Sequence, residues 1–157
     1  MNILTLGGSG HVSGAVARAA LDAGHTVWTV TRGHRPLPDG VKPLIADRHD
    51  TKALEQIIGG QDVLWDLVVD CICFDEQDMR QNIQLFRQRA KQLVFVSSDF
   101  VYDPSNRRFP QPEESEFWET SVPYGRNKRC SEEELINSDT GDMDWTVVRP
   151  CHIYGPT

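Results

Sequence analysis

The sequence lacks the features of membrane, secreted and nucleic-acid-binding proteins. Its 157 residues contain no apolar run near the ~20 residues that a transmembrane helix requires. No signal peptide is visible, because glycines interrupt the apolar run at the N-terminus. Basic residues are scarce: 16 Lys and Arg stand against 23 Asp and Glu, a formal net charge of −7. We therefore expect a cytoplasmic protein that binds neither nucleic acid nor membrane.

Cysteine and histidine are too few and too scattered to predict a metal or redox centre. The four cysteines, Cys71, Cys73, Cys130 and Cys151, match no zinc spacing, and Cys-x-Cys is not the redox motif Cys-x-x-Cys. The five histidines show no ligand spacing either. We expect reduced, buried thiols and no bound metal.

A glycine-rich turn follows the first apolar run. Residues 3–6 predict a buried strand, residues 15–23 a helix and residues 26–31 a second strand, and four glycines fall within eight positions of the first turn. Backbone N–H groups and the positive end of a helix dipole meet at such a turn, so it favours phosphate binding. An ordinary strand-to-helix turn is the alternative interpretation. The residues predicted to bind a dinucleotide here are Gly7, Gly8, Ser9, Gly10, His11 and Val12.

Strands and helices keep alternating along the rest of the chain. Parallel strands need crossover connections, so the expected fold class is α/β, with one Rossmann-like domain over residues 1–157 and a doubly wound parallel sheet. A long loop with four prolines and five acids, residues 103–123, interrupts the alternation. The remaining strands are expected at 41–46, within 63–73, at 93–97 and at 144–149, and the remaining helices at 51–58, 75–92 and 124–136.

The end of the second strand bears on the choice of cofactor. An NAD-binding protein usually carries Asp or Glu there, about twenty residues past the glycines, to bind the ribose 2′-hydroxyl. This sequence has no acid at that place and has Arg32 and Arg35 instead. A guanidinium can pair with a 2′-phosphate, so NADP(H) is favoured over NAD(H). The alternative is that both arginines are solvated surface charges.

A second group of residues predicts proton-transfer chemistry. Tyr124 and Lys128 are four residues apart in a predicted helix, which places them on one face about 5–6 Å apart at Cβ. A neighbouring ammonium would lower the tyrosine pKa from about 10 toward neutrality, so the tyrosine could exchange a proton with a substrate oxygen. Ser98, at the carboxyl end of the fifth strand, could hold the same oxygen by a hydrogen bond.

Taken together, these motifs resemble the extended short-chain dehydrogenase/reductase family, the NAD-dependent epimerase/dehydratase group. The resemblance implies that Gly7, Gly8 and Gly10 cradle the pyrophosphate and that Asp47 contacts the adenine amino group. It also implies that Tyr124 is the general acid/base and that Lys128 binds the nicotinamide ribose, with Ser98 as the active-site hydroxyl. The segments that carry it, in family order, are 6–13, 46–50, 65–70, 94–98, 101–102, 124–128, 148–150 and 154–156.

Three departures from the family pattern have consequences. Ser13 stands where the family has its third glycine, which predicts looser packing of helix on strand. Phe100 follows Asp99 where family dehydratases carry a second acid, which counts against water elimination and leaves redox or epimerisation chemistry. The sequence stops at Thr157, so we expect the C-terminal substrate domain of the family to be absent, in a fragment or a natural short form. A bare sheet edge should then make the chain self-associate.

The function expected from these features is an NAD(P)-binding domain, NADP preferred, of an epimerase/dehydratase-like oxidoreductase. Its substrate would be a small molecule, a sugar or nucleotide sugar, whose hydroxyl or carbonyl exchanges hydride with the cofactor. The alternative is a non-catalytic NADP-binding sensor or scaffold of the same fold. A homodimer through the helices of residues 75–92 and 124–136 is an assembly that the resemblance implies.

Overall fold

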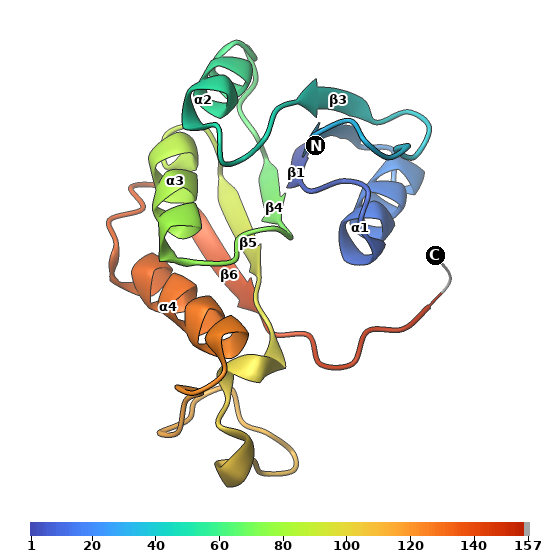
Figure 1. Ribbon diagram of the computed structural model, residues 1–157. Coiled ribbons are helices and arrows are strands. Elements are labelled where there is room, and N and C mark those ends of the chain that lie inside the picture. Colours follow the sequence, from blue (N-terminus) through green and yellow to red (C-terminus); the bar gives the residue numbers. More distant parts are fainter. Residues whose placement is uncertain (156–157) are drawn as a thin grey trace.

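The computed structural model describes residues 1–155 and contains a six-stranded parallel sheet with the strand order β3-β2-β1-β4-β5-β6 (Figure 1). The prediction of a Rossmann-like, doubly wound α/β fold is confirmed, because the chain crosses from β3 at one edge to β4 beside β1. The strands are β1 (Asn2–Leu6), β2 (Thr26–Thr31), β3 (Lys42–Ile45), β4 (Leu67–Asp70), β5 (Gln92–Val96) and β6 (Asp144–Val148). The helices are α1 (His11–Asp22), α2 (Thr51–Gly59), α3 (Glu76–Phe86) and α4 (Pro123–Asn137).

Helices cover the two faces of the sheet unequally. The large apolar core lies between the sheet and α2, α3 and α4, and includes Trp65, Phe86 and Leu135. On the other face α1 packs against β1 and β2 through a smaller cluster that includes Ala17 and Ala20 (Figure 1). Along β5, alternate residues are buried against the helices and only half-buried on the α1 side. The part of the α1 face formed by β5 and β6 is therefore left open by the described helices.

Local signals in the sequence explain where most helices begin and end. Asp50 and Asp75 cap α2 and α3 by accepting backbone N–H bonds at 3.1 and 3.0 Å. The helix expected at 75–92 ends at Phe86, because the Arg89 carbonyl accepts the N–H of Trp65 and draws the following residues toward the sheet. The helix expected from residue 15 already begins at His11.

The cysteines differ in their exposure. Cys73 is buried, Cys71 and Cys130 are intermediate, and Cys151 is exposed, so the expectation of buried thiols is wrong for Cys151. Burial, together with the negative charge of Asp70, raises the pKa of the Cys71 thiol to about 12. That thiol is protonated at neutral pH and is a poor nucleophile.

Within residues 1–155, none of the helices has both the length and the apolar character needed to cross a bilayer.

Candidate functional site

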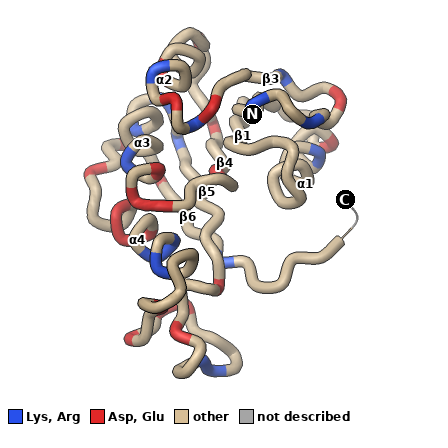
Figure 2. The backbone as a smooth tube through the Cα atoms, in the orientation of Figure 1, with Lys and Arg blue, Asp and Glu red and all other residues tan. Residues whose placement is uncertain are grey.

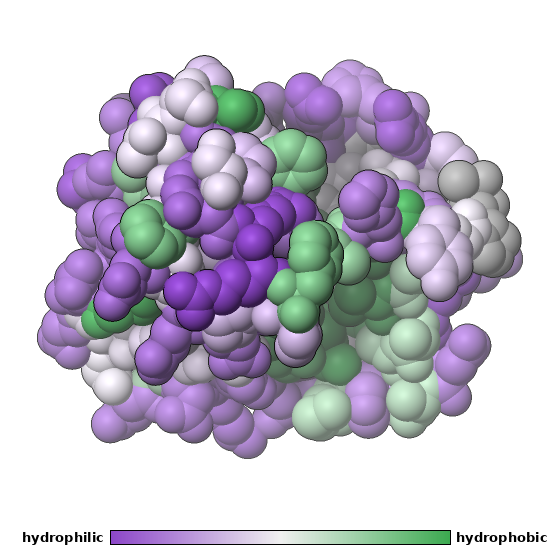
Figure 3. Space-filling model, turned by 90° about the horizontal axis from the view of Figure 1, so that it is seen from below, coloured by the Kyte–Doolittle hydropathy of each residue, from purple (hydrophilic) through white to green (hydrophobic). Residues whose placement is uncertain are grey.

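A cavity of about 520 Å³ lies at the carboxyl ends of β1, β2, β3 and β4, the edge where α/β sheets bind ligands. Figure 3 shows the molecule from the side of this edge, where a hollow has hydrophobic surface on its floor and lower side and hydrophilic surface above it. Four short segments line the cavity, one after each of these strands. They comprise Gly7 and residues 9–13, residues 30–32 with His34 and Arg35, residues 46–49, and Cys71, Ile72 and Phe74.

The glycine turn forms the wall next to α1. Gly7 has a φ of +85°, and a Cβ there would lie 2.6 Å from Ile72, so the turn needs glycine for both conformation and space. Gly8 does not line the cavity; a Cβ on it would overlap the side chain of Thr29 beneath the turn. Gly10 is the N-cap of α1, and the first turn of the helix behind it leaves amide N–H groups without helical partners. The wall is therefore a ready site for an anion.

Ser13, which stands where the resemblance implies a third glycine, is bonded within the first turn of α1. Its hydroxyl oxygen accepts the Gly10 N–H at 3.1 Å, and the residue is buried. A Cβ on the adjacent Gly14 would meet no described atom closer than 3.4 Å. The hydroxyl thus stabilises the start of α1 at the place where the family has glycine.

Basic side chains dominate the rim of the cavity. Arg32 and Arg35, both exposed, line it after β2 together with His34, and His49 lines it after β3. Asp47 is the single carboxylate among the lining residues, although acids are frequent on α3, on α4 and in the loop before α4 (Figure 2). The two exposed guanidinium groups, Arg32 and Arg35, suit a ligand with phosphates.

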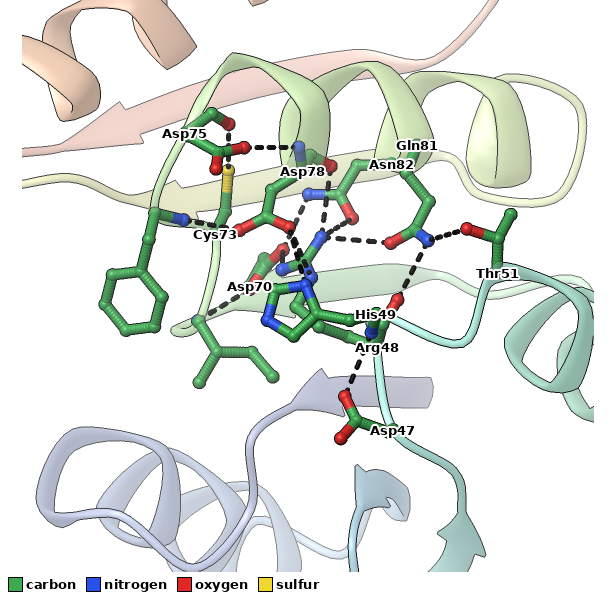
Figure 4. A network of polar contacts seen from close by, with 12 residues as sticks. Asp47, Arg48, His49, Thr51, Asp70, Cys73, Asp75, Asp78, Gln81 and Asn82 are labelled. Carbon is green, nitrogen blue, oxygen red and sulfur yellow. Dashed lines mark hydrogen bonds and ion pairs between the residues drawn. The ribbon is translucent and has the colours of Figure 1, made fainter.

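Arg48, next to Asp47, lies at the centre of a buried polar network (Figure 4). Its side chain is 3% exposed; Nη1 donates to Asp70 Oδ2 at 2.8 Å, and Nε lies 3.1 Å from Asp78 Oδ1. Nη2 donates to the Asp78 carbonyl at 3.0 Å and to Asn82 Oδ1 at 3.2 Å. Burial lowers the pKa of the guanidinium, but the two carboxylates raise it by more, so Arg48 stays charged. The network ties the end of β3 to the end of β4 and the start of α3.

Lys128 projects from α4 toward the cavity edge. It is 2% exposed, and its ammonium donates to the carbonyl oxygens of Cys73 at 2.7 Å and Val96 at 2.8 Å. It also lies 5.1 Å from the ring centroid of Phe74, which lines the cavity. An ammonium has three donors, and these two carbonyls use two of them. The Tyr124 hydroxyl is not among its described acceptors.

Ser98 and Tyr124 meet through Phe100. The Ser98 hydroxyl oxygen accepts the Phe100 N–H at 3.2 Å, and its own proton remains available for another acceptor. The ring of Phe100 meets that of Tyr124 edge-on, with centroids 6.1 Å apart, and Tyr124 is 45% exposed. Ser98, Tyr124 and Lys128 therefore lie on the carboxyl side of β5, outside the lining of the described cavity.

Asp99 is held away from this group. Its carboxylate pairs with Arg107 at 3.1 Å, and its main-chain carbonyl accepts a bond from the same guanidinium at 2.8 Å. These two contacts fix Arg107, and with it the loop before α4, against the end of β5.

Sequence reasoning missed Arg48, Asp70, Asp78, Ile72 and Phe74. Asp70 ends an apolar strand, and Asp78 is on the buried face of a helix. A carboxylate in either place needs a positively charged or hydrogen-bonding partner, which is the one signal in the sequence that could have pointed to this network. Nothing in the sequence told which of the chain's 16 Lys and Arg residues that partner is.

The fold and the glycine turn define a protein of the Rossmann class. A model of the NAD dependent epimerase/dehydratase family matches residues 3–157. This chain belongs to that family.

Many solved structures share the fold, and two of them serve as examples. A short-chain dehydrogenase/reductase superfamily protein from Agrobacterium tumefaciens with bound NAD aligns with a TM-score of 0.74 and 25% identity, covering 95% of this chain and 48% of that one. UDP-glucose 4-epimerase from Thermus thermophilus, in complex with NAD, aligns with a TM-score of 0.76 and 18% identity. The alignment covers 95% of this chain and 54% of the epimerase chain.

A curated relative is the chloroplast stem-loop binding protein of 41 kDa b from Arabidopsis thaliana, 25% identical over 169 residues. The match covers 98% of this chain and 42% of that protein. The chain thus spans about half the length of its relatives.

Proposed function

We propose that the cavity binds a nicotinamide dinucleotide, NADP(H) in preference to NAD(H), and that the chain is the cofactor-binding part of an epimerase/dehydratase-like oxidoreductase. The observation that carries this proposal is the glycine turn, with a positive φ at Gly7 and the N-terminus of α1 directed at a cavity with a basic rim. The solved relatives from Agrobacterium tumefaciens and Thermus thermophilus hold NAD, which supports the same class of ligand here.

Each segment of the cavity wall has a part in this proposal. The pyrophosphate would lie on residues 7–12, with Gly8 allowing the turn to pack on Thr29. Arg32 and Arg35 would pair with a 2′-phosphate by charge-assisted hydrogen bonds. Asp47 would accept a hydrogen bond from the adenine amino group. Lys128 would donate a hydrogen bond from its third N–H to the nicotinamide ribose.

The catalytic group would act on a sugar or nucleotide-sugar hydroxyl or carbonyl. A bound nicotinamide supplies hydride transfer. Ser98 would donate a hydrogen bond from its hydroxyl to the substrate oxygen, and Tyr124 would give or take the single proton transferred at that oxygen. The ion pair of Asp99 with Arg107, and the ring of Phe100 against Tyr124, support redox or epimerisation chemistry over water elimination.

Calorimetric titration with NADP⁺ and NAD⁺ tests the cofactor proposal. We expect NADP⁺ to bind more tightly, and R32A to reduce that preference by roughly tenfold to hundredfold, the effect of about 1.5–3 kcal/mol for one charge-assisted bond. R108A, in the exposed loop before α4, is the matched control and should leave the ratio unchanged. Equal affinities for the two cofactors would refute the preference, and binding of neither would refute the cofactor site.

The same samples test the remaining alternatives. Binding of NADP⁺ with no hydride exchange toward any nucleotide sugar would favour the sensor or scaffold function. The Arabidopsis relative is named for stem-loop binding, whereas we propose no nucleic-acid partner for this chain because of its net charge of −7. A salt-dependent gel shift with an RNA hairpin would overturn that part.

A further inference from the structure

The contacts of Arg48 reach two separate walls of the cavity. The Asp70 carboxylate accepts two hydrogen bonds: one from Arg48 Nη1 on Oδ2, at 2.8 Å, and one from the Ile72 N–H on Oδ1, at 2.7 Å. The Asp78 carboxylate forms an ion pair with Arg48 through Oδ1, and its Oδ2 accepts a hydrogen bond from the Phe74 N–H at 2.8 Å. Both carboxylates therefore hold Arg48 with one oxygen and the loop of residues 71–74 with the other.

The loop of residues 71–74 in turn contacts both ends of the proposed dinucleotide site. Ile72 packs beneath the glycine turn, 2.6 Å from where a Cβ on Gly7 would lie. The carbonyl of Cys73 accepts a hydrogen bond from Lys128, the residue proposed to hold the nicotinamide ribose. A shift of this loop would move both neighbours.

On the other wall, Arg48 fixes the segment that carries Asp47. Its main-chain carbonyl accepts a bond from Gln81 Nε2 at 2.9 Å, so both the side chain and the backbone of Arg48 are bound to α3. The Asp47 carboxylate points away from the network (Figure 4), and its Oδ1 accepts the His49 N–H at 3.0 Å. The direction of the Asp47 carboxylate is thus set by a turn that Arg48 holds in place.

We propose that Arg48 is a positioning residue for the dinucleotide. It holds Asp47 in the orientation that contacts the adenosine end, and it fixes this segment relative to the loop of residues 71–74, whose Cys73 carbonyl binds Lys128. The inference rests on the proposed dinucleotide site. The guanidinium itself is directed at protein acceptors from α3 and β4 and binds no part of the ligand. Lysine cannot replace it, because one ammonium lacks the planar fork that reaches Asp70, Asp78 and Asn82 together.

Fragment titration of R48K and Q81A tests this assignment. The probes are NADP⁺, 2′,5′-ADP for the adenosine end and NMN for the nicotinamide end. We expect R48K to lower the affinity for 2′,5′-ADP by at least about tenfold, the loss from one misaligned charge-assisted bond. The affinity for NMN should fall much less, because the bonds from the Ile72 and Phe74 N–H groups to Asp70 and Asp78 still hold the loop of residues 71–74 in R48K. Q81A removes the bond to the Arg48 carbonyl, a weak contact of Arg48 Nη2 at 3.3 Å and an exposed bond to Thr51, but keeps both carboxylate contacts of Arg48. It should therefore give a smaller loss of the same kind.

The control is R80K, on the exposed face of α3, where Arg80 pairs with Glu76 and Glu134. It should bind all three probes like the wild type. An R48K protein that loses both fragments equally, or neither, overturns the positioning role. If R48K does not fold, Q81A decides by the same criterion. A wild type that binds no probe refutes the proposed function itself, and the inference with it.

Discussion

Lys128 donates a hydrogen bond from its buried ammonium to the carbonyl oxygen of Cys73, 55 residues earlier in the chain, at 2.7 Å. The bond joins α4 to the loop after β4, and a second one to Val96 joins it to β5. Burial lowers the pKa of this ammonium, although the charge of Asp70 opposes the shift. The two carbonyls hold the charge at the cavity edge without a carboxylate partner within ion-pair distance in residues 1–155.

K128M should reduce the affinity for NADP⁺ about tenfold or more, because the ribose would lose one charge-assisted hydrogen bond. The free energy of unfolding should change by less than about 2 kcal/mol, since the variant loses two hydrogen bonds but also a buried charge. Calorimetry and urea denaturation measure the two effects. K91M, at an exposed lysine paired with Asp66, is the control and should keep its affinity. Full affinity in K128M would contradict the role given to Lys128.

E132Q should destabilise the protein by about 3–5 kcal/mol, because it leaves the partly buried Arg149 with an incomplete partner. The Glu132 carboxylate is fully buried and accepts Arg149 Nε at 2.8 Å and Nη2 at 2.9 Å, as well as Ser97 Oγ at 2.7 Å. Urea denaturation gives the loss. The neighbouring half-exposed Glu133 pairs with Arg129, so E133Q should cost less than about 1 kcal/mol. Equal losses in the two variants would show that the buried pair has no special weight.

Glu119 should make stability pH-dependent between about pH 4.5 and 2. Bonds from the Ser121 hydroxyl and the Val122 and Ser121 N–H groups lower the pKa of its carboxyl from 4.5 to about 2. A depressed folded-state pKa stabilises above the unfolded pKa, and this contribution disappears as pH falls toward 2. The difference in unfolding free energy between wild type and E119Q should therefore shrink from pH 5 to pH 2.5. The exposed E116Q is the control, and a constant difference for E119Q would count against this assignment.

The open side of the sheet should make the isolated chain self-associate. Strand β6 pairs only with β5 among the described strands, and Val148, 43% exposed, lies beside Val96 on the face that α1 leaves open. The outer face of α3 and α4 instead carries ion pairs, such as that of Arg80 with Glu134. Sedimentation velocity should show larger species as concentration rises, and V148E should suppress them while N137E on α4 does not. A monomer at millimolar concentration would contradict this expectation.

The local sequence determined the alternation of strands and helices, the glycine turn, the caps at Asp50 and Asp75, and the arginines at the end of β2. Each of these depends on residues close together in the chain, where hydrophobic period, backbone freedom and capping act directly. The position of Ser98, Tyr124 and Lys128 on the carboxyl side of the sheet followed from the same alternation, while their chemical roles stay predictions.

Tertiary structure alone decided which distant polar groups meet. The partners of Arg48 come from β4 and α3, and those of Lys128 from the ends of β4 and β5. The carboxylate partner of Arg149, Glu132, comes from α4. A buried charge needs a partner of opposite charge or a hydrogen-bonding dipole, but the sequence does not identify which residue supplies that partner. Which pair forms depends on how the crossovers place strands and helices side by side, and that is a property of the whole packed sheet.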